Sequence, residues 1–119
     1  MSTEISIIVK LKLAEPLTEK SRGILDKLTS HVESTEPGTL VYEWFLDDDQ
    51  TMVCVLERYS DSAAIITHSQ AMSPEQREKM AKIGTIESML VLGTPDEQLA
   101  SMLKKAGATI MAPLTGFYR

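Results

Sequence analysis

The order of strand-like and helix-like stretches is the feature of this sequence that most constrains its fold. Residues 5–13 alternate between apolar and polar side chains, as a half-buried strand does, and Pro16 ends the alternation. Apolar residues then recur with helical spacing as far as Val32, after an N-cap predicted at Thr18. The chain therefore begins with a strand that is followed by a helix with one apolar face.

A hairpin is predicted next. Two stretches rich in β-branched and aromatic residues, 40–46 and 51–59, are separated by the loop Asp47–Gln50. A loop centred on Asp48 and Asp49 fixes which residues face each other across the hairpin. The expected partners are Trp44 with Val53, Tyr42 with Val55, and Leu40 with Glu57.

The following segments return to helices and complete the core of the domain. A helix capped by Ser60 or Asp61 precedes the capping box Ser73–Gln76, which starts a second, shorter helix. Residues 85–92 form the fourth predicted strand. The resulting order, β-α-β-β-α-(α)-β, is the split βαβ pattern of an α+β, ferredoxin-like fold with an antiparallel sheet.

A C-terminal extension follows this core. The spacing of Thr94–Glu97 predicts a capping box with its N-cap at Thr94, and the helix that it starts ends at Gly107. A short apolar strand is expected in the tail. We therefore expect one domain over residues 1–119, with a core at about residues 5–92 and an extension at about residues 93–119.

Composition argues against several classes of partner and location. The formal net charge of −5 disfavours nucleic acid and anionic membranes, which attract basic surfaces. Cys54 is the single cysteine, so no intramolecular disulfide can form, as expected in a reducing compartment. The segment Met1–Glu4 lacks the basic start of a signal peptide, and no apolar run approaches the ~20 residues that span a bilayer. These features predict a cytoplasmic protein.

Both faces of the predicted hairpin are rich in apolar residues. In an antiparallel sheet with one solvent-exposed face, apolar and polar side chains alternate along each strand. A split βαβ arrangement places its helices on one face of the sheet only. A second copy of the chain is the simplest cover for the other face, so we expect a homodimer joined through Phe45, Met52 and Leu56. The alternative is a monomer with a few exposed apolar side chains.

Three segments resemble sequences of a known family. Glu36–Glu43 is similar to its "EPG…YE" segment, Val55–Asp61 to a strand ending in "l-E-x-W/Y-x-D", and Ala63–His68 to its "A-x-x-x-H" helix. The chain thus resembles the antibiotic biosynthesis monooxygenase family of dimeric α/β-barrel proteins. The resemblance implies a homodimer whose two sheets form a barrel, with a pocket between sheet and helices in each subunit. Members of this family include quinol or polyketide monooxygenases, haem-degrading enzymes, signal-molecule isomerases and proteins without assigned activity.

The candidate site lies on the helix-facing side of the predicted sheet. Tyr42, Trp44 and Tyr59 share that side and suit a planar aromatic ligand, unless they are simply core residues. His68 is the candidate acid–base catalyst, because the unperturbed pKa of histidine, ~6.5, is close to neutral pH. The alternative is a structural histidine bonded to a backbone carbonyl or to Glu57. A buried Glu57 needs a partner, so we expect it to orient His68 or to cap a helix.

No cofactor and no metal ion are expected. The run Asp47–Asp49 lacks the spacing of an EF-hand, and the sequence has no P-loop, no GxGxxG and no Cys/His cluster. The haem-degrading relatives use an asparagine on the first strand, a tryptophan at the end of the third and a haem-ligating histidine on a later segment. The resemblance aligns these with Val9, Tyr59 and Gln76–Lys79, so a haem-degrading activity is not expected.

These features lead to one preferred function and two alternatives. The preferred one is a cofactor-independent monooxygenase that oxidises a small phenolic or quinol-type substrate with dioxygen, using His68 as the base and Tyr42, Trp44 and Tyr59 as the aromatic slot. A non-catalytic, dimeric ligand-binding or stress-related protein is one alternative. An isomerase acting on a small oxygenated metabolite is the other.

Overall fold

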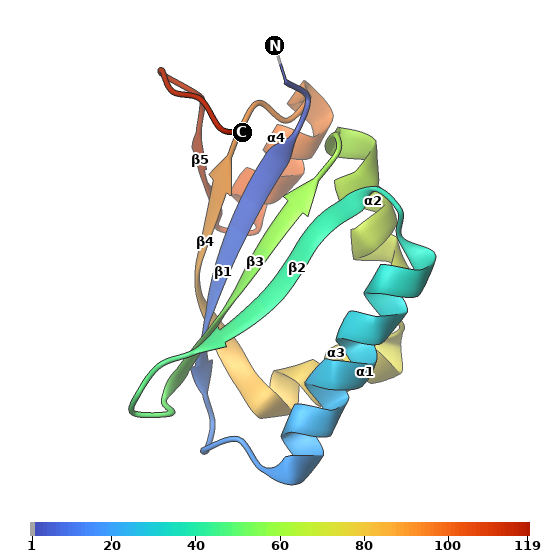
Figure 1. Ribbon diagram of the computed structural model, residues 1–119, viewed down its shortest axis with the longest axis vertical. Helices are drawn as coiled ribbons and strands as arrows, with labels where there is room; N and C mark the ends of the chain where they lie inside the picture. The colour runs from blue at the N-terminus through green and yellow to red at the C-terminus, as the bar shows by residue number, and fades with distance from the viewer. Residues whose placement is uncertain (1) are drawn as a thin grey trace.

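Five strands form a single sheet in the computed structural model, which describes residues 2–119. Their order across the sheet is β2-β3-β1-β4-β5 (Figure 1). The pairs β2–β3, β3–β1 and β1–β4 are antiparallel, and β5 is parallel to β4. The predicted α+β, ferredoxin-like class is confirmed. The strands are β1 (Ile5–Leu13), β2 (Thr39–Leu46), β3 (Met52–Tyr59), β4 (Gly84–Leu92) and β5 (Thr109–Met111).

The helices begin where the sequence provides caps. Thr18 and Ser73 each form a capping box, and the Asp61 carboxylate accepts a hydrogen bond from the backbone nitrogen of Ala64, so three predicted helix starts are confirmed. Within residues 2–119 the helices are α1 (Glu19–Thr35), α2 (Ser62–Ala71), α3 (Pro74–Ile83) and α4 (Glu97–Lys105).

The cap of α4 differs from the prediction. Thr94 was the expected N-cap, but Asp96 occupies that position, and its Oδ1 accepts a hydrogen bond from the backbone nitrogen of Leu99 at 2.9 Å. The backbone nitrogen of Asp96 also donates to Ser62 Oγ at 2.9 Å, which ties this segment to the start of α2. The tie holds Asp96 outside the helix and lets its side chain cap the first turn.

One core lies between the sheet and the helices. Alternate residues of β1 and β3 point toward the helices, and Ile5, Val55 and Tyr59 among them are almost completely buried. All four helices contribute to this core and therefore cover the same face of the sheet (Figure 1). Burial of each such side chain contributes roughly 1.5–3 kcal/mol to folding. The helical contributors are Leu25, Ile65, Ile83, Leu99 and Leu103.

The hairpin is shifted by two residues from the predicted register. Trp44 lies opposite Val55 and Tyr42 opposite Glu57, because the pairing of Leu46 with Val53 encloses residues 47–52 and centres the hairpin one residue later than expected. The Asp47 carboxylate organises this loop by accepting hydrogen bonds from the backbone nitrogens at positions 51 and 52. A shift of two residues preserves which side chains share a face.

A bulge at the start of β2 corrects the prediction for Leu40. Thr39 pairs with Tyr59 and Val41 with Arg58, so Leu40 has no partner of its own and is half exposed. A bulge inserts one residue into a strand and changes the side to which the side chain points. Leu40 therefore does not join Tyr42 on the helix-facing side.

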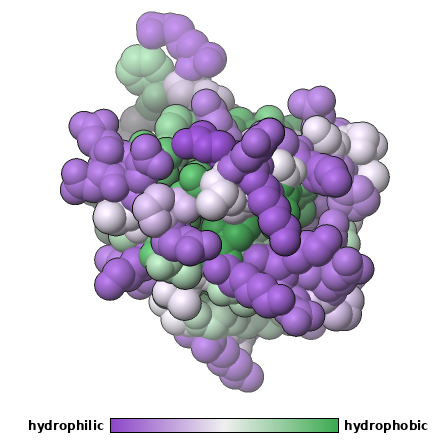
Figure 2. Space-filling model, turned by 90° about the horizontal axis from the view of Figure 1, so that it is seen from below, coloured by the Kyte–Doolittle hydropathy of each residue, from purple (hydrophilic) through white to green (hydrophobic). Residues whose placement is uncertain are grey.

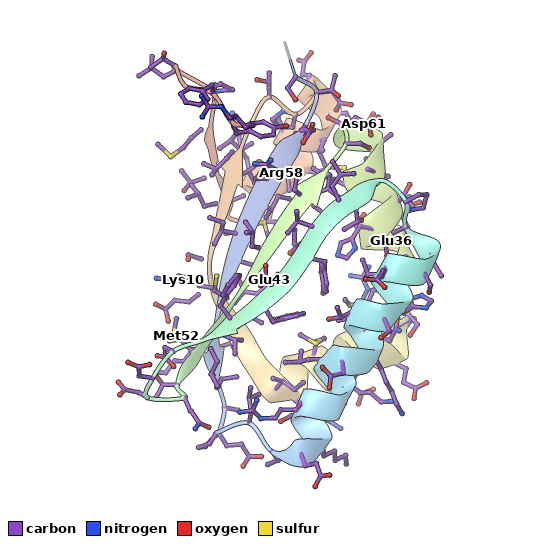
Figure 3. All side chains as sticks on the ribbon, in the orientation of Figure 1. Lys10, Glu36, Glu43, Met52, Arg58 and Asp61 are labelled. Atoms are coloured by element: carbon purple, nitrogen blue, oxygen red, sulfur yellow. The ribbon has the colours of Figure 1, made fainter. Side chains whose placement is uncertain are left out.

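The face of the sheet opposite the helices carries exposed apolar side chains. Ile8 of β1 pairs with Leu56 of β3 and Leu90 of β4 on this face, and Phe45 of β2 is 47% exposed. Polar residues are interspersed, and Figure 3 labels Lys10, Glu43 and Arg58 among them. The predicted apolar character of both faces is thus present. We call this surface the outer face; it is formed by Ile8, Phe45, Met52, Cys54, Leu56, Leu90 and Leu92.

The helices do not seal the lower end of the molecule. Seen from below, hydrophobic residues are visible at the centre of the surface within a surround of hydrophilic ones (Figure 2). Apolar side chains are therefore accessible at this end of the molecule.

Candidate functional site

A cavity of about 460 Å³ lies between the helix-facing side of the sheet and helices α2 and α3. This volume is within the range of small-molecule sites, about 300–1,000 Å³. Most of its walls are apolar. The sheet contributes Val9, Leu11, Tyr42, Trp44, Val55, Glu57, Thr85, Ile86 and Met89, and the helices and their ends contribute His68, Met72, Arg77, Met80, Ala81 and Gly84.

Strand and helix periodicity explain why the polar side chains meet. Tyr42, Trp44 and Glu57 occupy alternate positions on β2 and β3, so all three point toward the helices. On α2 the residue three positions before His68 is Ile65, which is buried in the core. His68 therefore lies on the face of α2 that is turned toward the sheet.

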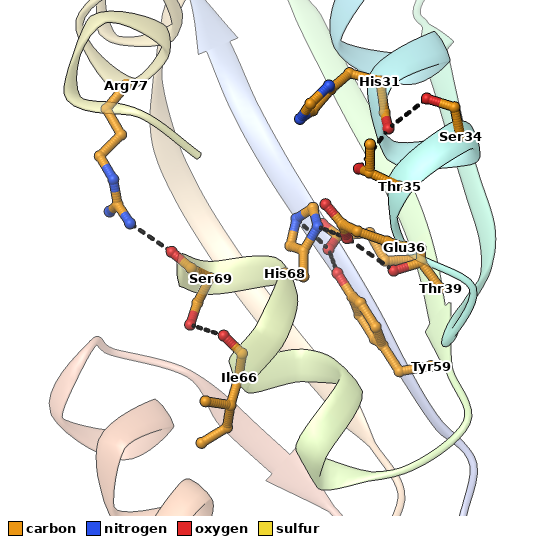
Figure 4. Close-up of polar contacts among 11 residues, drawn as sticks. His31, Ser34, Thr35, Glu36, Thr39, Tyr59, Ile66, His68, Ser69 and Arg77 are labelled. Atoms are coloured by element: carbon orange, nitrogen blue, oxygen red, sulfur yellow. Dashed lines mark hydrogen bonds and ion pairs between the residues drawn. The ribbon is translucent and has the colours of Figure 1, made fainter. Parts of the chain in front are cut away.

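His68 lies between two glutamates and is hydrogen-bonded to one of them, Glu36. Its Nδ1 lies 2.7 Å from Glu36 Oε1, and its Nε2 lies 3.6 Å from Glu57 Oε1 (Figure 4). Glu36 is only 4% exposed and also accepts a hydrogen bond from Thr39 Oγ1. Since a carboxylate can only accept, the short bond to Glu36 places the proton on Nδ1 and leaves the Nε2 lone pair on the Glu57 side. In this tautomer Nε2 of His68 can act as a base.

Glu57 is the buried carboxyl group of the site. Burial raises the pKa of Glu57 above its ordinary value, and the charge of Glu36 adds to this, while the hydrogen bond from the Tyr59 hydroxyl and the proximity of His68 lower it in part. Glu57 therefore retains a proton at a higher pH than an exposed glutamate. A carboxyl group beside a histidine in a cavity can donate a proton as well as accept one.

Tyr59 lies behind the cavity rather than on its surface. It is fully buried, it donates to Glu57, and it is absent from the cavity walls. Burial, followed by the charge of Glu57, raises the pKa of Tyr59 beyond its usual range, so the hydroxyl stays a donor. The structure thus brings Tyr59 to the site as a residue that positions Glu57, whereas the sequence suggested contact with the ligand.

Tyr42 and Trp44 form an aromatic wall next to His68. Their ring centroids are 5.9 Å apart with the planes at 85°, and the Tyr42 ring is 5.6 Å from that of His68. Burial and the charges of Glu57 and Glu36 raise the pKa of Tyr42 beyond its usual range, and the nearby Trp44 indole lowers it only in part. Trp44 Nε1 is buried without a hydrogen-bond partner of good geometry among the described residues.

Two residues of the site were missed by the sequence analysis. Glu36 was noted only as the start of the segment Glu36–Glu43, yet it caps the C-terminus of α1 and holds His68. Arg77 was noted only because its segment lacks a histidine, yet it lines the cavity together with Met80, three residues later on α3. The i, i+3 spacing of Arg77 and Met80 is a signal that could have been noticed.

Other classes of site find no support in the described part of the chain. Over residues 2–119 no group of three or more His, Cys, Asp and Glu side chains is arranged to hold a metal ion. No helix in that range is long and apolar enough to cross a membrane. Cys54 lies on the outer face and does not line the cavity.

Comparison with known proteins identifies the family. The sequence model described as antibiotic biosynthesis monooxygenase matches residues 5–81. The chain belongs to the antibiotic biosynthesis monooxygenase family. A search of curated proteins found no match.

Solved structures of this family share the fold at low sequence identity. MupZ from Pseudomonas fluorescens superposes with a TM-score of 0.77 at 19% identity, covering 100% of this chain and 91% of MupZ. SnoaB from Streptomyces nogalater, described as a cofactor-independent oxygenase, superposes with a TM-score of 0.60 at 11% identity, covering 80% of this chain and 96% of SnoaB. A putative antibiotic biosynthesis monooxygenase from Caulobacter crescentus CB15 superposes with a TM-score of 0.58 at 20% identity, covering 76% of this chain and 86% of that protein. The C-terminal extension is thus included in the match to MupZ.

The aromatic wall leads to a prediction for this family member. Trp44→Ala is expected to weaken the binding of 2-naphthol about tenfold or more, because a large stacking surface is lost. The unfolding midpoint should fall by only a few degrees, because Trp44 lies at the edge of the core and not within it. Isothermal titration calorimetry and thermal unfolding measure the two effects. Trp44→Phe is the conservative control, and unchanged affinity in Trp44→Ala would contradict a ligand site here.

A second prediction concerns haem. The positions that resemble those of haem-degrading relatives hold Val9, Tyr59 and Gln76–Lys79, so the segment lacks the imidazole that would bind iron. Titration with haemin is therefore expected to give weak binding without a sharp Soret shift, and added reductant should not bleach the band. Stoichiometric binding followed by loss of the Soret band would place the protein in the haem-degrading branch.

Proposed function

We propose that this protein is a cofactor-independent monooxygenase that oxidises a small phenolic or quinol-type aromatic substrate with dioxygen. The observation that supports this best is a histidine that is held through Nδ1 by a buried glutamate and lines a largely apolar cavity with aromatic walls. Such a reaction needs a base and a dry slot, because a phenolate gives up electrons to dioxygen far more readily than a phenol does. The description of SnoaB as a cofactor-independent oxygenase is consistent with this proposal.

In this mechanism each residue has a separate task. His68 Nε2 takes the phenolic proton, and Glu36 holds the imidazole in the required tautomer and stabilises its charged form. Tyr42 and Trp44 hold the aromatic ring. Glu57, whose pKa is raised by burial, is the group that donates a proton to the reduced oxygen when it carries one. A phenol with one free ring position and one O2 then give a quinone and one water, and the substrate supplies all four electrons.

The proposal extends to the state and location of the protein. We include in it a homodimer joined through the outer face and a cytoplasmic location. The family match is consistent with a dimer, because the related proteins are generally dimeric. The outer face would provide the interface, because the helices cover only the other side of the sheet.

Oxygen uptake tests the proposed reaction. A panel of phenols and quinols is incubated with the protein, without added flavin or metal, in an oxygen electrode, and the products are analysed after reaction under 18O2. Uptake above autoxidation, with one labelled oxygen in the product, is expected. Ligands that stabilise the protein without any turnover would instead favour the non-catalytic binding protein.

The pairing of His68 with Glu57 favours an isomerase as the second candidate. An isomerase removes a proton at one carbon and returns one at another, a task that two neighbouring acid–base groups can share. The Glu57 carboxyl lies 3.6 Å from His68 Nε2 and has a raised pKa, as such a donor requires. Deuterium exchange from solvent into a carbonyl substrate without oxygen uptake would distinguish the isomerase from the monooxygenase.

A further inference from the structure

One face of α3 borders the cavity of the site. Arg77, Met80 and Ala81 line it, and their i, i+3, i+4 spacing places them on one side of the helix. Met80 and Ala81 provide apolar surface. Arg77 is the single lysine or arginine among the described residues of the cavity walls. The cavity therefore has one fixed position for positive charge.

The other charged side chains of α3 neutralise each other. They form two ion pairs, each spanning one helical turn, with N–O distances of 3.3 and 3.9 Å. The residues one turn from Arg77 are Ser73 and Ala81, so no carboxylate is available to it on its own helix. None of the ion pairs formed within residues 2–119 includes Arg77. The paired residues are Glu75 with Lys79 and Glu78 with Lys82.

Backbone carbonyls hold the guanidinium in place without neutralising it. Arg77 Nη2 donates to the Ser69 carbonyl at 2.5 Å, and Nε donates to the Met72 carbonyl at 3.4 Å. Figure 4 shows how the side chain of Arg77 reaches from α3 to the end of α2. These two bonds use two of the five N–H donors of a guanidinium. Arg77 is exposed, and its remaining donors form no hydrogen bond with the described residues, so they can bind a ligand.

We infer that Arg77 binds a carboxylate of the substrate, which makes the substrate of this site an aromatic acid. This inference rests on the proposed function. A guanidinium binds a carboxylate through two parallel hydrogen bonds, for which Arg77 has the free donors. Arg77 supplies the positive charge of the cavity wall and His68 its base, so the carboxylate lies at Arg77 and the hydroxyl lies at His68. Arg77 therefore determines both the substrate class and its orientation.

A matched pair of probes tests the role of Arg77. The probes are 6-hydroxy-2-naphthoate and its neutral analogue 6-hydroxy-2-naphthamide, which differ only in the charged group. Isothermal titration calorimetry at low ionic strength is expected to show about tenfold tighter binding of the acid to the wild-type protein. Arg77→Gln is expected to remove this preference, because its affinity for the acid falls about tenfold while its affinity for the amide is unchanged. Arg77→Lys should retain part of the preference.

The control removes a positive charge from the same helix. Lys79 is exposed, is paired with Glu75 and does not line the cavity, so Lys79→Gln should keep the preference for the acid. Trp44→Ala should lower the affinity for both probes by the same factor.

Three results would overturn the inference. The first is equal affinity of the wild-type protein for the two probes, and the second is no binding of either probe. The third is an equal loss of affinity for both probes in Arg77→Gln, together with a lower unfolding midpoint. That result would mean that Arg77 only caps the C-terminus of α2. The measurements involve no turnover. Preferential binding of the acid without oxygen uptake would therefore count against the monooxygenase and leave the role of Arg77 intact.

Discussion

Phe45→Glu is expected to convert the protein from a dimer into a monomer. Light scattering at micromolar concentration should give twice the chain mass of 13.2 kDa for the wild type and a single chain mass for the variant. Phe45 is 47% exposed on the outer face, where we propose the interface. A twofold axis brings the substitution into the interface twice, and each buried, unpaired carboxylate costs several kcal/mol. The dissociation constant should therefore rise about a thousandfold or more.

Met102→Glu is the matched control for this prediction. Met102 is 48% exposed, nearly the same as Phe45, but it lies on α4 and so on the helix side of the molecule. Its substitution should leave the mass unchanged. A wild-type protein with the mass of one chain would refute the proposed dimer, and dissociation of both variants would mean that added charge, rather than the outer face, is responsible.

The sequence predicted the faces of the sheet better than the register. Side chains alternate with a period of two, so the observed two-residue shift of the hairpin left Tyr42, Trp44 and Glu57 together. The shift itself arises from the hydrogen bonds of Asp47 within its loop. The loop sequence Asp47–Gln50 alone does not predict that these hydrogen bonds form. The bulge at Leu40 was equally hidden, because an insertion of one residue leaves no trace in an apolar stretch.

The candidate site was predicted only where local pattern determines it. His68 and Glu57 are brought together by strand parity and by a helix that follows directly. Glu36 is 32 residues from His68, and its contact depends on how the end of α1 packs against α2. Arg77 lies on a helix with five charged residues, so its apolar face is difficult to recognise in the sequence. No local sequence pattern encodes the packing between elements. This packing brings Glu36 and Arg77 to the site, where Glu36 orients the base and Arg77 is proposed to bind a carboxylate.

His68→Gln is expected to lower the rate of oxygen uptake about 10²- to 10⁴-fold, the range that a general base contributes. A glutamine side chain is similar in size and can still donate a hydrogen bond to Glu36, so the local structure should persist. Its amide cannot accept a proton at neutral pH. Binding of 2-naphthol should change no more than a few-fold, because Tyr42 and Trp44 are unaltered. A loss of rate without a loss of affinity would identify His68 as a catalyst and not as a packing residue.

His31→Gln is the matched control, because His31 is the other histidine of the chain and is exposed on α1. The same substitution there should leave oxygen uptake and 2-naphthol affinity at wild-type values. Glu36→Gln should give an intermediate loss of rate, because it weakens the hydrogen bond that fixes the tautomer of His68 but leaves the base itself in place. Full activity in His68→Gln would exclude His68 as the base. An equal loss in His31→Gln would show that the rate reports the state of the fold and not proton transfer in the cavity.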